Sequence, residues 1–244
     1  MTCEHMPTPL ADAAAKDAVI LADAPPDGTL PGDAAPDAPP PSTPMLVQQA
    51  GNSANPATTV SATLPAAPTN GRVLVMVGAA QSGALTSVTG GGATWTRATQ
   101  SLDNTNIEIW WGVTDGSSAV VTVSRTIESS PIWLHVSEWT NLETAGTLDR
   151  ATSTSGLSSP ASSGSITTAN ARDLIIFGAT AQAPNTFGTP SQGPWTMLNG
   201  VVGQLDVQGE WYRVVTATGT FAPAVTYNGA GDWEAGIAAF RIVP

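Results

Sequence analysis

Hydrophobic and polar positions divide the chain into two parts with different patterns. From residue 45 onward, short apolar runs rich in Val, Ile and Trp alternate with clusters of Gly, Asn, Ser and Pro. β-Branched and aromatic residues favour strands, and the polar clusters between them favour turns. The clearest runs predict strands over 72–78, 106–112, 119–124 and 132–139. No segment keeps a 3.6-residue apolar period, so we predict an all-β body.

Short strands with regular spacing and turn signals between them are typical of antiparallel sandwiches. We therefore predict an antiparallel, jelly-roll-like β-sandwich over residues 45–244. About 200 residues are enough for one sizeable domain with its own core.

The body also carries an internal repeat at an offset of 100 residues. Three pairs of tryptophans coincide under this shift, namely Trp95 and Trp195, Trp111 and Trp211, and Trp133 and Trp233. We infer a tandem duplication, with pseudo-repeats over 45–147 and 148–244. Residues kept in both copies are expected to serve the shared fold, so these tryptophans are predicted core residues.

Residues 1–44 have a different composition. They hold ten of the twenty prolines, seven acidic residues, one Lys and no aromatic residue. Such a segment cannot bury enough apolar surface to offset the entropy lost on ordering, so we predict an extended, disordered stalk. Cys3 stands directly before this stalk. Two interpretations of it stay open, the lipidated residue of a surface lipoprotein and a free thiol.

Charge and cysteine content exclude several classes of protein. The formal net charge is −11, of which residues 1–44 carry −6 from one Lys and seven acids. The body carries the remaining −5, which argues against a nucleic-acid binder. A single Cys excludes an internal disulfide framework and a cysteine-built zinc site. No run of 18 apolar residues occurs, so no transmembrane segment is predicted.

Residues suited to catalysis are sparse in the body. Its single histidine, His135, lies in the middle of a predicted strand and is interpreted as a packing residue. A carboxylate pair for glycan hydrolysis could come from four glutamates in or near predicted strands, namely Glu108, Glu138, Glu210 and Glu234. Gly90–Gly92 lacks the Lys of a phosphate loop and is interpreted as a flexible turn. No cofactor is predicted except Ca²⁺, which the oxygen-rich loop Asp103–Asn106 could contact.

Trp110 is a tryptophan that the repeat does not explain. It alternates with Trp111, so it points to the opposite face of its strand, and its counterpart at the 100-residue offset is Glu210. Tyr212 alternates with Trp211 in the same way. Aromatic rings can stack on sugars, and a carboxylate accepts hydrogen bonds from hydroxyls. We therefore take Trp110, Tyr212 and Glu108 as candidate ligand-binding residues.

Several stretches of the body carry a resemblance to a known group of domains. They are residues 70–78, 93–96, 107–111, 137–142, 148–149 and 162–168. In these stretches the body resembles an uncharacterised family of jelly-roll or β-sandwich domains in secreted bacterial proteins. The stalk resembles the tether of bacterial surface lipoproteins of the myxobacterial type. These resemblances imply an extracellular or cell-surface bacterial location and define no catalytic residues to carry over.

The leading hypothesis is a non-catalytic, secreted or surface-tethered sandwich that binds a glycan or another surface polymer. The first alternative is a structural or adhesive protein whose strand edges pair with copies of itself or with partners. The second alternative is a carboxylate-dependent glycan hydrolase.

Overall fold

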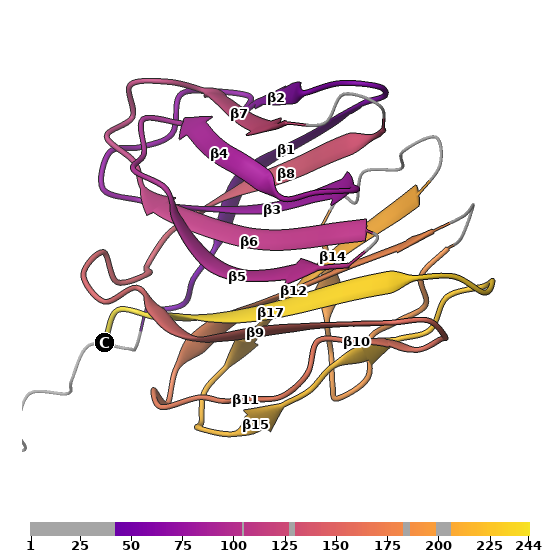
Figure 1. Ribbon diagram of the computed structural model, residues 1–244. Helices are drawn as coiled ribbons and strands as arrows, with labels where there is room; N and C mark the ends of the chain where they lie inside the picture. Colours follow the sequence, from indigo (N-terminus) through magenta and orange to yellow (C-terminus); the bar gives the residue numbers. More distant parts are fainter. Residues whose placement is uncertain (1–41, 104, 127–129, 183–185, 199–205) are drawn as a thin grey trace, which may run out of the picture. The chain divides into compact units, whose positions relative to one another are not determined.

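The computed structural model describes residues 42–103, 105–126, 130–182, 186–198 and 206–244. Within these ranges the chain forms seventeen strands joined by turns and loops, and all strand pairing is antiparallel (Figure 1). The predicted all-β sandwich is confirmed. The described ranges contain no helix that is long and apolar enough to cross a membrane. Residues 1–41 of the predicted stalk, Cys3 among them, lie outside the described residues.

The first half of the body forms a sandwich of two sheets. Its five-stranded sheet has the order β1-β8-β3-β6-β5, and its outer sheet has the order β2-β7-β4. The strands are β1 Leu46–Ala54, β2 Thr59–Thr63, β3 Val73–Gln81, β4 Leu85–Gly90, β5 Thr96–Leu102, β6 Thr105–Val113, β7 Val120–Arg125 and β8 Ile132–Trp139. The first strand pairs with the eighth, the second with the seventh and the third with the sixth, which is the pairing of a jelly roll.

The second half repeats this order with shorter outer strands. Its five-stranded sheet has the order β13-β14-β12-β17-β9, and its outer strands form the pairs β10-β16 and β11-β15. The strands are β9 Leu148–Gly156, β10 Ala161–Ser162, β11 Ile166–Thr167, β12 Asp173–Gln182, β13 Thr196–Met197, β14 Asp206–Val215, β15 Thr220–Phe221, β16 Ala224–Val225 and β17 Trp233–Arg241. Strands β9, β12, β14 and β17 thus occupy the places of β1, β3, β6 and β8.

The two jelly rolls are stacked through their five-stranded sheets, so the body has four layers (Figure 1). We call the interface between these two sheets the joint. Its apolar part includes Val75, Trp139, Leu174 and Phe240. The chain therefore forms two stacked sandwiches, a choice that the sequence left open.

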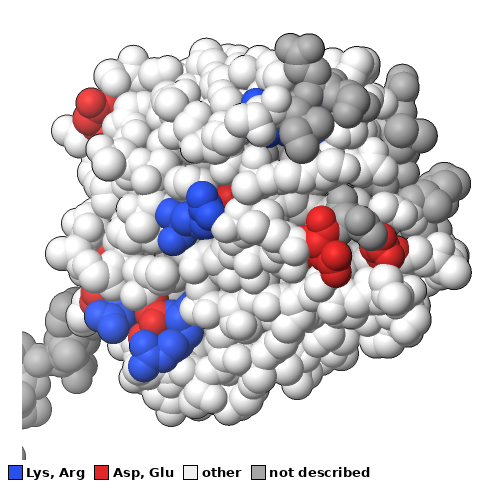
Figure 2. Space-filling model, in the orientation of Figure 1, with Lys and Arg blue, Asp and Glu red and all other residues white. Residues whose placement is uncertain are grey.

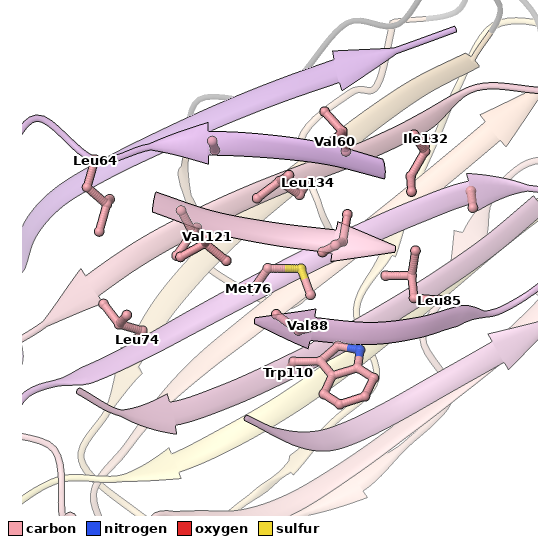
Figure 3. Packing of buried hydrophobic residues seen from close by; sticks show 14 residues of the cluster. Val60, Leu64, Leu74, Met76, Leu85, Val88, Trp110, Val121, Ile132 and Leu134 are labelled. Carbon is pink, nitrogen blue, oxygen red and sulfur yellow. The ribbon is translucent and has the colours of Figure 1, made fainter. Parts of the chain in front are cut away.

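Stacking explains two different burial patterns along the strands. Strands β3, β8, β12 and β17 are buried along nearly their whole length, because both faces of each central sheet are covered. Strand β2 alternates between buried and exposed residues, because one face of the outer sheet meets water. Figure 3 shows the core of the first roll, where β2, β7 and β4 cover the central sheet.

Strands β3, β6 and β8 correspond to β12, β14 and β17 at an offset of 101 residues, one more than the sequence suggested. Trp110 pairs with Met76 inside the first roll, and Trp211 pairs with Phe177 inside the second. Trp111 instead faces the joint. The equivalence of Trp111 with Trp211 is therefore wrong, because a shift of one residue moves a side chain to the other face of the sheet.

All eight tryptophans are nonetheless buried or half-buried. Trp95 and Trp195 each pack inside their own roll, as a repeat predicts. Trp233 also lies inside the second roll, whereas Trp133 shares the joint face of β8 with His135. The six paired tryptophans thus serve the cores, as predicted, although two of the three proposed pairs are not equivalent.

The close approach of the two rolls predicts the effect of adding a methyl group at the joint. A Cβ atom at Gly178 would lie 2.9 Å from Val77 Cγ1 and 3.1 Å from Ile107 Cδ1. We expect Gly178→Ala to lower the free energy of unfolding by about 1–3 kcal/mol through overpacking. Gly236→Ala is the matched control, because its Cβ would meet Thr99 at a more tolerable 3.3 Å. Denaturant unfolding would contradict the account if both variants lost equal stability.

Candidate functional site

Glu108 lies inside the first roll, where its carboxylate organises the edge of the outer sheet. Its Oε1 accepts hydrogen bonds from the Leu85 amide at 2.8 Å, Asn106 Nδ2 at 2.8 Å and Gln100 Nε2 at 3.0 Å. Its Oε2 accepts one from Trp110 Nε1 at 2.8 Å. The side chain is fully buried. Both oxygens of this carboxylate are thus hydrogen-bonded to other groups of the protein.

Trp110 is covered on both sides of its ring. One side packs in the core of the first roll, near Val88 and Leu85 of β4 (Figure 3). Over the ring lies the guanidinium of Arg97, whose Cζ is 4.7 Å from the ring centroid. Arg97 Nε also lies 3.2 Å from Glu108 Oε2. Trp110 does lie on the face opposite Trp111, but it is buried there and not presented to a ligand, because its strand faces a second sheet on that side.

Tyr212 lies in a different layer. It faces the joint and packs edge-on against Trp139, with ring centroids 4.9 Å apart. Glu108 and Trp110 are joined by a hydrogen bond, whereas Tyr212 belongs to another core. The three candidate ligand-binding residues thus do not form one face.

The four glutamates considered for hydrolysis are also separated. Glu108 lies inside the first roll, and Glu138 bonds Gln48 and Arg72 near the start of β1. Glu210 and Glu234 face the joint from strands on either side of β12. All four are fully buried. These four glutamates therefore form no carboxylate pair that a glycan could reach.

The predicted calcium loop is only partly described, because Asn104 lies outside the described residues. Its neighbours have different partners: Asp103 Oδ2 accepts a hydrogen bond from Ser155, and Asn106 Nδ2 donates to Gly83 O and Glu108. No group of three or more His, Cys, Asp or Glu side chains in the described ranges could hold a metal ion. The calcium site remains a prediction.

A pocket of about 440 Å³ opens at one end of the first roll, between the β4–β5 turn and the β6–β7 loop. Its polar lining comes mainly from Gly90, Gly92, Thr94, Asp115, Ser117 and Ser118. Hydroxyls, backbone groups and one carboxylate can all bind a polar ligand here. No arginine or lysine belongs to the described lining.

Gly90 and Gly92, which belong to a run of three consecutive glycines, line this pocket. Gly90, Gly91 and Gly92 have φ values of +83°, +67° and +62°, which side chains with a Cβ rarely adopt. Hydrogen bonds hold the turn, from Trp95 Nε1 to Gly90 O at 2.9 Å and from the Asp115 amide to Gly92 O at 2.7 Å. The glycine run is therefore a turn, as the sequence predicted, and hydrogen bonds anchor it.

Asp115 is held in place beside this glycine turn. The Ser117 amide donates to Asp115 Oδ1 at 2.8 Å. Hydrogen bonds from the Ser117 hydroxyl and amide hold the pKa of this exposed carboxyl below its usual value. A Cβ atom on Gly92 would lie only 2.1 Å from Asp115 Oδ1. Asp115 is thus an ionised, oriented hydrogen-bond acceptor. Because Gly92 has no side chain, there is room for the Asp115 carboxylate beside it.

The sequence contained one signal of this pocket, which was the glycine run itself. Asp115 gave no signal, because an Asp in a polar loop is an ordinary turn residue. Comparisons with protein-family models, curated proteins and solved structures found no match for the chain. The resemblance to secreted bacterial sandwich domains accordingly stays a prediction.

The hydrogen bonds of Glu108 predict a structural role that can be measured. We expect Glu108→Gln to lower the free energy of unfolding by about 1–3 kcal/mol, because one amide NH₂ would face donors in a buried site. Glu143→Gln, in the loop after β8, is the control and is expected to change stability by less than about 0.5 kcal/mol. Equal stabilities of the wild type and Glu108→Gln in urea would contradict this role.

Proposed function

We propose that the body is a non-catalytic binding module for uncharged carbohydrate, and that the ligand binds in the pocket beside Gly90–Gly92. The observation that carries the proposal is an ionised, oriented carboxylate beside hydroxyl groups in an anchored, open pocket. A carboxylate accepts hydrogen bonds from two neighbouring sugar hydroxyls, and charge-assisted hydrogen bonds are stronger than neutral ones. Binding residues are often placed on loops that a rigid scaffold positions.

The charge around the pocket supports an uncharged ligand over an acidic one. Asp115 is the charged residue of the described lining. Uronic acids or sulfated sugars would bring like charge next to this carboxylate. Figure 2 shows few charged side chains on the face it presents, which suits a neutral polymer near the protein surface. The proposal keeps the glycan hypothesis and moves its site from Trp110 and Tyr212 to Asp115.

Asp115→Asn tests the pocket with little change to its structure. An Asn Oδ1 can still accept the Ser117 amide, so the loop should persist while the negative charge is lost. An array of neutral and acidic glycans would first identify the glycan that the wild-type protein binds. We expect the affinity of Asp115→Asn for this glycan to be at least about tenfold lower, which corresponds to 1.4 kcal/mol. Isothermal titration would measure this loss.

Asp103→Asn is the matched control, because Asp103 is an exposed carboxylate that does not line the pocket. It should bind as the wild type does. Gly92→Ala is a second test, since its methyl group would displace Asp115. The proposal fails if no neutral glycan on the array binds, or if Asp115→Asn binds with wild-type affinity.

A further inference from the structure

The joint between the two rolls has an apolar end and a polar end. The apolar end is closed by large side chains such as Trp139 and Phe240. Toward the other end, strands of both rolls direct polar side chains into the joint, namely His135, Thr180, Gln208, Glu210 and Glu234. Each of these five residues is at most 2% exposed. A polar layer is therefore enclosed between the two rolls.

Hydrogen bonds cross the joint within this layer. His135 Nδ1 of the first roll lies 2.5 Å from Glu210 Oε2 of the second. Gln208 Nε2 donates to Val77 O at 3.2 Å. The Asp103 amide donates to Glu234 Oε1 at 3.1 Å. Hydrogen bonds thus hold this end of the joint, and their strength depends on the geometry of the donor and acceptor groups.

The layer is incompletely hydrogen-bonded. Several of its buried atoms have no hydrogen-bond partner, namely His135 Nε2, Glu210 Oε1, Gln208 Oε1, Thr180 Oγ1 and the nearby Trp133 Nε1. Buried polar groups without partners are costly, because they have lost their hydrogen bonds to water. The polar end is therefore the weaker end of the joint, and a further buried charge there would be poorly tolerated.

Glu234 is the group in this layer that can gain such a charge. Burial raises its pKa to about 8, and the negative charge of Asp103 acts in the same direction. The hydrogen bond from the Asp103 amide to Glu234 Oε1 opposes the shift, whereas Glu234 Oε2 has no hydrogen-bond partner. Near neutral pH the carboxyl is therefore mostly protonated.

The groups facing Glu234 offer no positive charge close by. Asp103 and Thr105 face it from the first roll. The residues beside it on β12 and β9 are Thr180 and Ser155. On β14, beyond β12, lie Gln208 and Glu210, and Glu210 contacts His135 of β8 in the first roll. No ion pair of Glu234 occurs among the described residues, so its deprotonated form would be a buried, uncompensated anion.

We propose that the polar end of the joint is a pH-sensitive latch between the two jelly rolls, closed while Glu234 is protonated and loosened when it loses its proton. The folded protein binds this proton more tightly than the unfolded chain does. Its contribution to stability is therefore fully present at acidic pH and is lost as pH rises from the ordinary pKa of glutamate through about 8. The apolar end keeps the rolls associated, so the opening is local.

Amide hydrogen exchange of the full chain tests this latch, with rates corrected for the intrinsic effect of pH. Between about pH 6.5 and 9.5, we expect protection of β14 and β17 to fall at least about tenfold. Protection of β2 and β7, which lie far from the joint, should stay constant and serves as the internal control. A wild-type protein with no selective loss in β14 and β17 would overturn the proposal.

Three variants assign the effect to Glu234. Glu234→Gln mimics the protonated carboxyl, so protection should no longer depend on pH. Asp103→Asn removes the neighbouring charge at a surface position, and the midpoint of the transition should move to lower pH. Glu138→Gln removes a buried glutamate away from the joint and should leave the midpoint unchanged. A transition that persists in Glu234→Gln, or an unmoved midpoint in Asp103→Asn, would refute the assignment.

Discussion

The packing of the two five-stranded sheets against each other is the interaction on which the rest of this structure depends. Strands β3, β8, β12 and β17 carry apolar side chains on both faces. One face is covered by the smaller outer strands of the same roll, and the other is covered only when the second roll is present. Because burial of apolar area is the main stabilising term, neither roll is complete by itself.

A second constraint comes from β5, which pairs with β6 and leaves the outer sheet of the first roll to end at β4. Side chains take the place of the missing neighbour. Glu108 accepts the hydrogen bond of the Leu85 amide, and Trp110 fills the space beneath β4, with Arg97 over its ring. A group of residues that suggested a ligand-binding face is thereby explained as the closure of an incomplete sandwich.

The pocket and the polar layer place different demands on the same scaffold. The pocket lies in loops at the end of the first roll, where an anchored glycine turn holds Asp115 open to solvent. The polar layer lies between the rolls, where Glu234 is enclosed and its pKa is raised. Two carboxylates of one chain therefore differ in protonation near neutral pH because one is exposed and hydrogen-bonded to donors, whereas the other is buried.

The sequence by itself determined the all-β class, the main central strands of the first half and the core role of the tryptophans shared by the repeat, because these follow from local composition and period. It also indicated two related halves. Only the tertiary structure decided which face each side chain takes, since a strand has a period of two and an error of one residue reverses every assignment. For this reason Trp110 corresponds to Trp211 rather than to an unrelated Glu210, and lies in a core. Leu85, Arg97 and Gln100, which contact Glu108, lie on β4 and β5, and Asp103, which contacts Glu234, lies on the other roll. No pattern along the chain could reveal these contacts.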